Sequence, residues 1–533
     1  MAILESDANN FEQRRHFKLY NVFICMFMGL AGTAYGTTAS VIGTTLGQPS
    51  FFKAMGLNAS NEASLTGAMN SLYYAGGVFG AVCHGWMADR FGRKIDIFAG
   101  ATMIVVSQAL IAGSVNPAMF IVFRFFCGWG GFQCAAGVPL WMAEVVPPGH
   151  RGMLSDLCSI MITLGYALTG YVGLGFYFLD TPNTWRGPLA LAMIPGVILI
   201  CGIYWLPESP RYLLTKERYE EAWDVVSRLH SDPKDPHNEF AQREYYQMYK
   251  QIQFDASLNE GYRNILSRPS YRKRAFISIT LMICTMSSGL LTIINYGVQL
   301  YAKLGYNAVQ TLLFQTGYLA FAFLWATVAM SFVDKVPRNR LMGTGFAGAC
   351  VAVALEMILT AKFLHTDNKA GLATAVFAFF LYIFCYNMTL DGPMFFYHAE
   401  IWPTHMRARG LTLAMAAYSG INIVWLQAAP TAFKNIGWKY YIFFVVFSAI
   451  GSVLCFFVFP DTLHKPLEEI AAIFGDEDLV QVYQKELDSA KIELEVIQEV
   501  IPVKGRAVID RKEGKEGMGE TRTQELEDIG SHV

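Results

Sequence analysis

Acidic and basic side chains recur at the ends of apolar segments in this sequence, at spacings that suit ion pairs. Asp89 and Arg93 follow one apolar segment, and Glu144 and Arg151 follow another. The further members of the set are Glu208, Arg211, Asp334, Arg338, Glu400 and Arg407. Partly exposed ion pairs contribute about 1 kcal/mol each, so they can break and re-form. The pattern favours a device that switches between two conformations over a catalytic centre.

A second set of ionisable residues lies inside the apolar segments, where charge is costly and usually functional. The set comprises Arg124, Glu356, Asp391, Asp156, His84 and His398. Asp391 precedes Gly392-Pro393, so it is either a proton carrier or a polar group that satisfies backbone freed by a helix break. Glu356 is interpreted as a partner in helix–helix packing.

Twelve apolar segments of membrane-spanning length must position these residues. Because 53% of the residues are hydrophobic and only 16% are charged, we expect most of the chain to lie in a bilayer. The segments are 20–44, 68–88, 97–115, 118–141, 156–178, 188–206, 275–300, 310–333, 341–363, 371–399, 411–433 and 438–459. The sequence therefore predicts an all-α membrane protein with twelve transmembrane helices.

Composition and motifs exclude several functions. The net charge of −2 provides no basic excess for binding nucleic acid. Ten cysteines lie in apolar segments without a CxxC pair, so we expect neither disulfides nor a metal site. No phosphate-binding glycine-rich loop occurs, which leaves an ATP-driven pump unsupported. The sequence implies no reaction chemistry, and we expect no enzymatic activity and no cofactor. The expected partners are a small-molecule substrate and the lipid bilayer, with the chain acting as a monomer.

Alternate loops are enriched in Lys and Arg, which predicts that these loops and both termini are cytoplasmic. The loop after the second segment carries Arg90, Arg93 and Lys94, whereas the loop after the third carries no basic residue. Asn58 begins a glycosylation sequon in the first outside loop, so we expect it to be glycosylated. Asn387 begins another sequon, but it lies within a segment and should stay unmodified.

The charged motifs occur twice along the chain. Ala143-Glu144-Val-Val-Pro147 follows the fourth segment, and Ala399-Glu400-Ile-Trp-Pro403 follows the tenth. Duplicated helical units are typical of transporters whose substrate site lies between two halves. The predicted organisation is a cytoplasmic N-tail (1–19), a six-helix bundle (20–206), a cytoplasmic helical linker (207–274), a second six-helix bundle (275–459) and a C-tail (460–533) that is disordered at its end.

Taken together, the motifs resemble the sugar porter family of the major facilitator superfamily, and its fungal-type sugar transporters in particular. The matching stretches are Gly85–Lys94, Arg124–Gly130, Pro139 with Glu144, Arg151-Gly152, Pro207–Leu213 and Pro460–Thr462 with Pro466–Ile470. The resemblance covers residues 15–475 and implies two pseudo-symmetric bundles that work by alternating access. It also implies that the charged motifs gate the cytoplasmic side, pairing in the outward-open state and separating in the inward-open state. The alternative is that the basic loops only set the topology.

The resemblance also bears on proton coupling. Arg124, which we count among the gating residues, matches an arginine that faces an aspartate of the first span in proton-coupled members. The corresponding stretch here, Ala34 to Thr38, has no carboxylate, and Gly36 or Thr37 stands near the aspartate's place. This favours facilitated diffusion, because a coupling site must change its charge. The alternative is a proton symporter in which Asp391 replaces the missing carboxylate.

The expected substrate site is less polar than the family pattern. Where sugar-selective members carry glutamines and an asparagine, this chain has Tyr166, Thr285, Met286 and Leu291. Each unmet hydroxyl of a hexose costs about 1–3 kcal/mol in a dry site. A less hydroxylated sugar, a glycoside or a non-sugar metabolite is therefore a possible substrate. The candidate binding residues are Tyr166, Thr285, Ser287, Ser288, Asn295, Tyr296, Gln299, Tyr397 and Asn422.

The predicted function is secondary transport of a sugar or sugar-like metabolite across a plasma membrane, by facilitated diffusion. Two alternatives remain besides proton symport. One is an exporter of a less polar metabolite, which would suit the depleted site. The other is a nutrient sensor that does not transport and signals through its tail.

Overall fold

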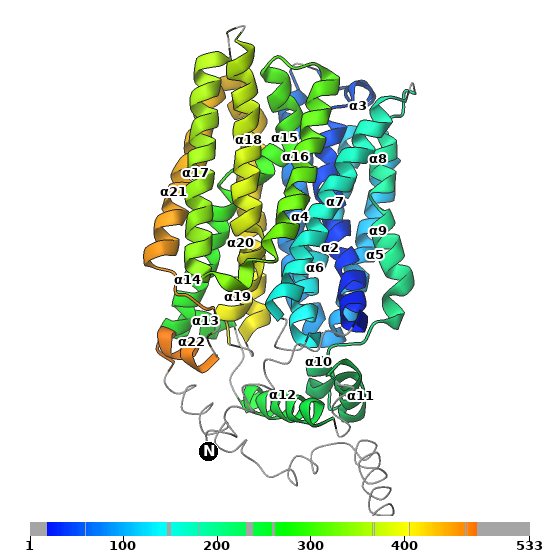
Figure 1. The fold of residues 1–533 in the computed structure, drawn as a ribbon. Coiled ribbons are helices and arrows are strands. Elements are labelled where there is room, and N and C mark those ends of the chain that lie inside the picture. The colour runs from blue at the N-terminus through cyan, green and yellow to red at the C-terminus, as the bar shows by residue number, and fades with distance from the viewer. Residues whose placement is uncertain are drawn as a thin grey trace, which may run out of the picture. The chain divides into compact units, whose positions relative to one another are not determined.

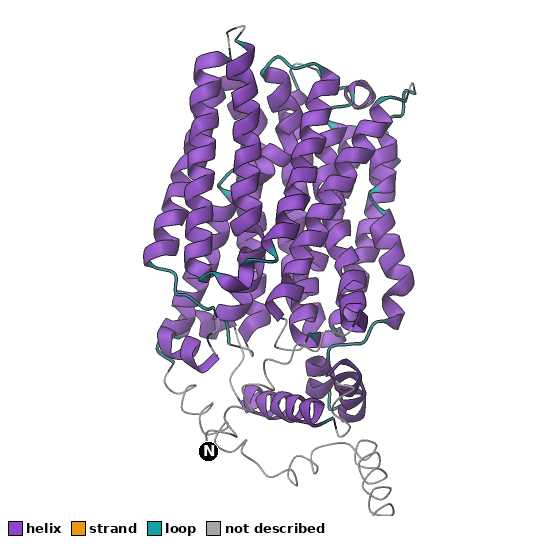
Figure 2. Cartoon of the chain, in the orientation of Figure 1, coloured by secondary structure: helices purple, strands orange, loops and turns teal. Residues whose placement is uncertain are grey.

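The computed structural model describes residues 19–476, apart from 59, 147–150, 180, 231–237, 258–261, 365, 367, 404–405, 464 and 466. Both predicted tails lie largely outside the described residues. Every regular element in the described part is a helix (Figure 2). Contacts divide this part into two units, which are described separately: the residues from Pro207 to Asn259, and a membrane unit formed by everything else.

The first half of the membrane unit contains six spans (Figure 1). They are α2 (Leu19–Thr45), α4 (Glu62–Phe91), α5 (Arg93–Ala112), α6 (Pro117–Val145), α7 (Arg151–Tyr177) and a broken span of α8 (Arg186–Leu191), α9 (Ile194–Gly202) and η2 (Ile203–Trp205). The short helix α3 (Pro49–Ala54) lies between α2 and α4.

The second half repeats this series. Its spans are α14–α15 (Pro269–Met286, Leu290–Lys303), α16 with η3 (Ala308–Ala329, Val333–Lys335), α17 (Arg338–Phe363), α18–α19 (Lys369–Thr389, Asp391–Ile401), α20 (Arg407–Asn435) and η5 with α21 (Gly437–Tyr440, Tyr441–Phe457). Two short helices flank the half, α13 (Tyr262–Ser267) and α22 (Leu467–Phe474). All twelve predicted apolar segments are thus confirmed as helices.

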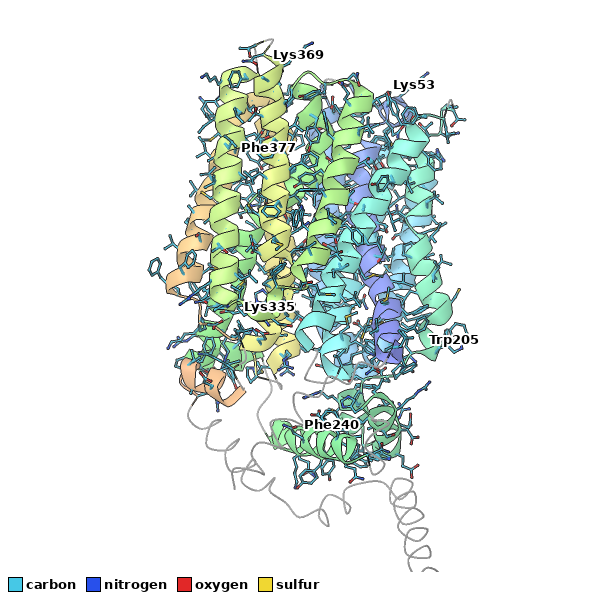
Figure 3. The ribbon with its side chains drawn as sticks, in the orientation of Figure 1. Lys53, Trp205, Phe240, Lys335, Lys369 and Phe377 are labelled. Atoms are coloured by element: carbon cyan, nitrogen blue, oxygen red, sulfur yellow. The ribbon has the colours of Figure 1, made fainter. Side chains whose placement is uncertain are left out.

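Length and hydropathy agree with membrane crossing. Eleven spans in the described part are long and apolar enough to cross a bilayer. The remaining span, α4, is 30 residues long and carries polar residues such as Asn70 and His84. Large apolar side chains such as Phe377 and Trp205 face outward (Figure 3), as expected for surfaces in contact with lipid. All ten cysteines are free.

Helix contacts in the two halves follow the same scheme. In the first half α2 packs on α7, α4 on α6, and α5 on both α6 and α9. In the second half the corresponding contacts are α14 on α20, α16 on α18, and α17 on both α18 and α21. The most extensive contacts between the halves are those of α4 with α20 and of α7 with α16. The two bundles are therefore pseudo-symmetric, and a symmetric pair of helix contacts holds them together.

Glycines set the closest helix contact in the first half. A Cβ atom on Gly128 of α6 would lie 1.7 Å from the carbonyl oxygen of Tyr73 on α4. In return, a Cβ atom on Gly76 of α4 would lie 1.8 Å from the carbonyl oxygen of Phe125 on α6. At both points the added Cβ atom would meet backbone atoms of the other helix, so a change of side-chain rotamer could not relieve the clash. The small residues let α4 and α6 approach closely in a way that larger residues would forbid.

We expect Gly128→Ala to reduce the amount of folded protein in the membrane severely. The added methyl group must push α4 and α6 apart, and overpacking of this kind typically costs about 1–3 kcal/mol or more. The measurement is the yield of monodisperse protein after detergent extraction. Gly420→Ala is the matched control, because a Cβ atom there meets nothing within 4 Å. Equal yields for the two variants would contradict the close-contact role of Gly128.

Two spans of the second half are broken within the membrane, one of them beside the Gly392-Pro393 pair, where a helix break is one interpretation of the sequence. α14 and α15 are separated by Gly289, whose φ of +102° is left-handed and favours glycine. α18 and α19 are separated at Leu390, directly before Asp391. Breaks of this kind expose backbone groups at mid-membrane depth, where transporters place their binding sites.

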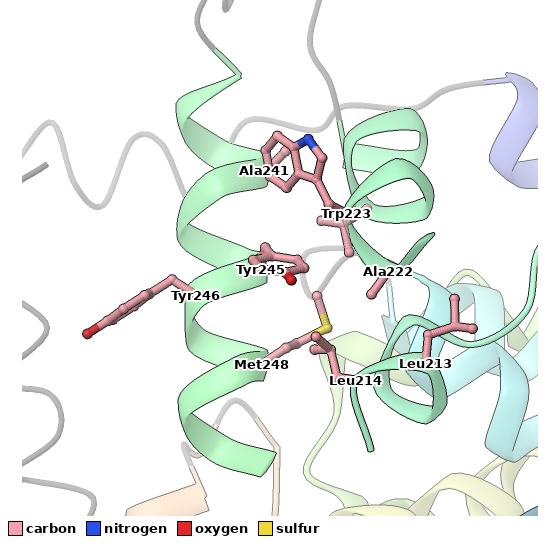
Figure 4. Close-up of a cluster of buried hydrophobic side chains, with 9 residues drawn as sticks. Leu213, Leu214, Ala222, Trp223, Ala241, Tyr245, Tyr246 and Met248 are labelled. Carbon is pink, nitrogen blue, oxygen red and sulfur yellow. The ribbon is translucent and has the colours of Figure 1, made fainter. Parts of the chain in front are cut away.

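The separate unit contains α10 (Pro210–Thr215), α11 (Tyr219–His230) and α12 (Glu239–Ser257). Trp223 of α11 and Tyr245 of α12 pack ring edge to ring face at 5.5 Å between centroids. Leu213 and Leu214 of α10 and Met248 of α12 belong to the same buried cluster (Figure 4). This core makes the segment a small helical unit in its own right.

Candidate transport site

A buried ion pair joins the ends of α5 and α6 in the first half. Arg93 donates from Nε and Nη2 to the two carboxylate oxygens of Glu144, at 2.9 and 3.0 Å. Arg93 Nη1 also donates to the carbonyl of Ala88 at the end of α4 and lies 3.7 Å from Asp89. Gly92, with a φ of +101°, makes the sharp turn that brings α4 and α5 to this point. One guanidinium therefore ties three helix ends together.

The second half holds a matching cluster at the corresponding positions of the repeat. Arg338 Nη2 donates to Asp334 at 2.8 Å and to Glu400 at 3.4 Å. Its Nη1 donates to the carbonyl of Val333, five residues earlier, as Arg93 does to Ala88. Thr462 adds a 2.5 Å hydrogen bond to the second oxygen of Glu400. The duplication seen in the motifs is thus reproduced in individual hydrogen bonds.

The first cluster differs from the sequence-based expectation in exposure. The side chains of Arg93 and Glu144 are only 10% and 9% exposed, so the expectation of partly exposed, weak pairs is wrong for them. Each cluster lies within one half. The pairs fix the helix ends inside each half, and breaking one costs more than a surface pair would.

The other predicted gating residues are distributed as follows. Arg407 begins α20 and is buried. Glu208 accepts a hydrogen bond from the backbone N–H of Ser209, and Arg211 lies in the first turn of α10; both belong to the separate unit. Arg151 begins α7, and its side chain lies outside the described part.

Hydrogen bonds join the two halves on both sides of the midplane. Toward one end, Ser71 of α4 donates to Gln427 of α20 at 2.6 Å. Toward the end that carries the charged clusters, Ser159 of α7 donates to the carbonyl of Asp391 on α19 at 3.2 Å. Between these points the hydroxyls of Tyr35 and Tyr418 lie 3.1 Å apart. Opening the protein to either side therefore requires only a few hydrogen bonds between the halves to break.

Aromatic rings surround the central Tyr35–Tyr418 bond. Phe132 of α6 lies between them, with its ring 5.2 Å from each of the other two ring centres. Tyr73 and Tyr74 of α4 pack on the same phenylalanine at 6.4 and 5.7 Å. All five rings are buried. Sequence reasoning missed this cluster, although the adjacent tyrosines of the second segment were a visible signal. Rings of this kind can stack on the face of a sugar or another flat solute.

Arg124 lies beside this cluster, and no carboxylate of the described residues is hydrogen-bonded to it. Its Nη1 donates to the carbonyl of Thr38 at 2.7 Å, and its guanidinium lies 4.5 Å from the centre of the Tyr73 ring. The Thr38 hydroxyl lies 3.1 Å from the Tyr73 hydroxyl. Thr38 is therefore the residue of the first span that lies opposite Arg124, which corrects the expectation that Gly36 or Thr37 does. Gly36 packs against α7, and Thr37 bonds to Ala192.

Most of the predicted substrate-binding side chains form hydrogen bonds with other groups of the protein. Thr285 donates to Leu281 O at 2.7 Å, and Asn422 Nδ2 donates to Tyr418 O at 2.8 Å. The remaining contacts are Trp425 to Ser287, Ser288 to Tyr382, Asn295 to Leu291 O, and Tyr296 to Leu426 O. Tyr166 is buried and Gln299 half-buried. The Asn295 side chain lies next to the hydroxyl of Tyr74, and neither Asn295 Oδ1 nor that hydroxyl has a well-formed hydrogen bond within the described residues.

Tyr397 lies apart from the other predicted substrate-binding residues. Its hydroxyl donates to the carbonyl of Pro460 at 2.8 Å, and its ring stacks on Phe459. Both contacts lie just beyond the end of the last span, so Tyr397 anchors that end of the chain. The prediction that it binds substrate came from its position next to the Gly-Pro break, which does not reveal the direction of its side chain.

The ionisable residues inside the spans have different surroundings. His84 lies 2.5 Å from Asp96, and both are fully buried. Glu356 accepts a 2.7 Å hydrogen bond from Thr360, one turn later on its own helix, rather than from another helix as expected. His398 is buried without a hydrogen-bond partner in the described part. Asp156 and Asp391 lie in the contact between the two halves.

Twelve spans in two matching halves, with a repeated ion-pair cluster and a central aromatic site, define a secondary transporter of the major facilitator fold. The chain belongs to the Sugar (and other) transporter family, whose model matches residues 24–474. The family consists of transporters and not enzymes. The fold is the one found in the xylose transporter XylE of E. coli, which superposes with a TM-score of 0.74 at 20% identity and covers 86% of this chain and 100% of that one.

Similar proteins of known name come from fungi and bacteria. The MFS-type transporter criB of Aspergillus cristatus is 28% identical over 455 residues, which is 85% of this chain and 93% of criB. The high-affinity glucose transporter of Kluyveromyces lactis is 27% identical over 484 residues, which is 86% of each chain. The arabinose-proton symporter of Bacillus subtilis is 27% identical over 474 residues, which is 86% of this chain and 96% of the symporter.

Proposed function

We propose that the protein carries a sugar or a sugar-like metabolite across a plasma membrane as a monomer, by facilitated diffusion. The observation that carries the proposal is that Arg124 is hydrogen-bonded to the backbone carbonyls of Thr38 and Met69 and to no carboxylate of the described residues. A backbone carbonyl does not change its charge, so these contacts offer no proton site beside the arginine. The names of the relatives support a sugar as the substrate, since they include glucose, arabinose and xylose transporters.

The test is uptake by cells that lack their own sugar transporters. Labelled glucose, xylose and arabinose are offered with and without a proton uncoupler, and we expect equilibration without accumulation. Accumulation that an uncoupler abolishes would favour proton symport, and failure to move any sugar would redirect the search to other metabolites.

Export of a less polar metabolite is the second candidate. It is favoured by the buried aromatic cluster and by the many polar side chains already bonded to backbone. Such a site suits a solute with a flat apolar face and few hydroxyls. Efflux from preloaded vesicles distinguishes this candidate from sugar uptake. The sensor alternative depends on a tail that lies outside the described residues.

The proposed topology places both termini in the cytoplasm and the loop before α4 outside. Asn58 is exposed in that loop, whereas Asn387 is buried in α18. We therefore expect Asn58 to be glycosylated in a eukaryotic host and Asn387 to remain unmodified. The measurement is a glycosidase-sensitive gel shift that Asn58→Gln removes. A shift that survives Asn58→Gln and disappears with Asn387→Gln would overturn the topology.

A further inference from the structure

Two carboxylates from opposite halves meet in the contact that closes the end carrying the charged clusters. Asp156 belongs to α7 and Asp391 to α19, and they are only 3% and 7% exposed. Asp156 lies directly against the residue after Asp391: a Cβ atom on Gly392 would be 1.9 Å from Asp156 Oδ1. Ser159, one turn after Asp156, bonds to the Asp391 carbonyl. The two acids therefore share one dry contact between the halves.

The protein leaves part of each carboxylate without a partner. Asp156 Oδ2 and Asp391 Oδ2 are both buried and accept no hydrogen bond within the described residues. The charged groups that act on Asp156 are Asp391, Asp334 and Arg338. Arg338 is already bonded to Asp334 and Glu400. The titratable neighbours of Asp391 are Cys158, Tyr166, Tyr386 and Tyr418, none of which supplies positive charge.

Electrostatics limits the charge that this contact can hold. Two ionised carboxylates that share a buried site repel each other, and each has lost its hydration. One proton between them removes the repulsion and provides an O–H donor for an oxygen that otherwise lacks a partner. We propose that Asp156 and Asp391 form a proton-binding site shared by the two halves, and that its proton is exchanged with the cytosol. The assignment of the cytosolic side rests on the proposed function and topology.

The site has a direct consequence for opening. When the halves separate at this end, both carboxylates meet water, and the proton passes to cytosolic water or buffer. The site must take up a proton from the same side before the halves close again. Bound protons therefore favour the closed contact, and by linkage a closed contact favours proton binding. Because uptake and release occur on one side, the site senses cytosolic pH without moving protons across the membrane.

Cys158 provides a native reporter for this contact. It is buried on α7 and interacts electrostatically with both Asp156 and Asp391. The experiment measures N-ethylmaleimide labelling of Cys158 by mass spectrometry, in sealed vesicles whose two faces are buffered separately. Labelling is normalised to glutathione in the same buffer, which removes the ordinary pH dependence of thiol reactivity.

In the wild type we expect labelling to rise as the pH at the cytosolic face is raised from 6 to 8. In the steepest part of the curve, the labelling rate should change by about tenfold per pH unit, because one proton is released per opening. Asp156→Asn and Asp391→Asn mimic the protonated state and should give low labelling that does not change with pH. Glu356→Gln is the matched control, since Glu356 is equally buried but bonds within α17, and it should keep the wild-type profile.

Three results would overturn the proposal. They are a flat wild-type profile, an unchanged slope in both asparagine variants, and a response to the pH of the outer face alone. If an asparagine variant does not reach the membrane, Asp391→Ser is used in its place. The pH profile of wild-type labelling is by itself sufficient to support or to overturn the proposal. No solute is present, so a failure of the sugar uptake assay would reject the proposed function without affecting this result.

Discussion

Arg93→Ala is expected to leave the protein in the membrane but to lower its transport rate more than tenfold. The substitution removes the contacts of Arg93 with Glu144 and Ala88, so the Glu144 carboxylate loses the guanidinium that donates to both of its oxygens. Removing one partner of a buried pair typically costs about 3–5 kcal/mol. The two transport conformations differ by only a few kcal/mol, so a loss confined to one of them displaces the equilibrium strongly.

The measurement is initial uptake divided by the amount of protein at the cell surface. Arg90→Ala is the control, because Arg90 belongs to the same motif but is exposed. Glu144→Ala should act in the same direction as Arg93→Ala. If both variants transport at the wild-type rate while the protein level is unchanged, the ion-pair cluster serves only topology, and the gating role is wrong.

Thr38→Asp is expected to make transport depend on the outside pH. Among the described residues the wild type has no carboxylate beside Arg124, so its uptake should be the same at outside pH 5 and pH 8 when the cytosolic pH is held constant. The new carboxylate would lie beside Arg124 and Tyr73 and would change its charge with the conformation of the site. A group that titrates in this way couples proton binding to the conformational equilibrium.

The assay compares uptake at the two pH values with and without an uncoupler, in the wild type, Thr38→Asp and Asp391→Asn. Thr38→Ser is the control for a change at this position without a new charge. Accumulation in the wild type that is lost with the uncoupler, together with exchange alone in Asp391→Asn, would identify Asp391 as a proton carrier. Facilitated diffusion would then be wrong.

The twelve spans and the repeated charged motifs could be predicted because their signals are strong and local. Long apolar runs identify membrane helices whatever the helices pack against. The pairing of Arg93 with Glu144 follows from two motifs that recur together. The break at Gly289 was not predicted, because an isolated glycine in an apolar run is also compatible with a continuous helix.

The substrate site was harder to predict because it depends on helix phase. An error of one residue turns a side chain by about 100° around the helix, which is why Gly36 and Thr37 were expected where Thr38 lies. The same uncertainty placed Tyr397 in the site, although it bonds to Pro460. A serine or threonine hydroxyl can bond either to a substrate or to a protein group nearby. Its neighbours in space decide between the two, and the sequence does not contain that information.

The contact between Gly392 and Asp156 also limits how this sequence can diverge during evolution. Any side chain at position 392 must occupy space that the Asp156 carboxylate now fills. A mutation at 392 therefore requires the Asp156 side chain to move aside or to become smaller. The two positions lie in different copies of the ancient duplication. The contact therefore couples one position of each copy, and a change at either of them alters the space available to the other.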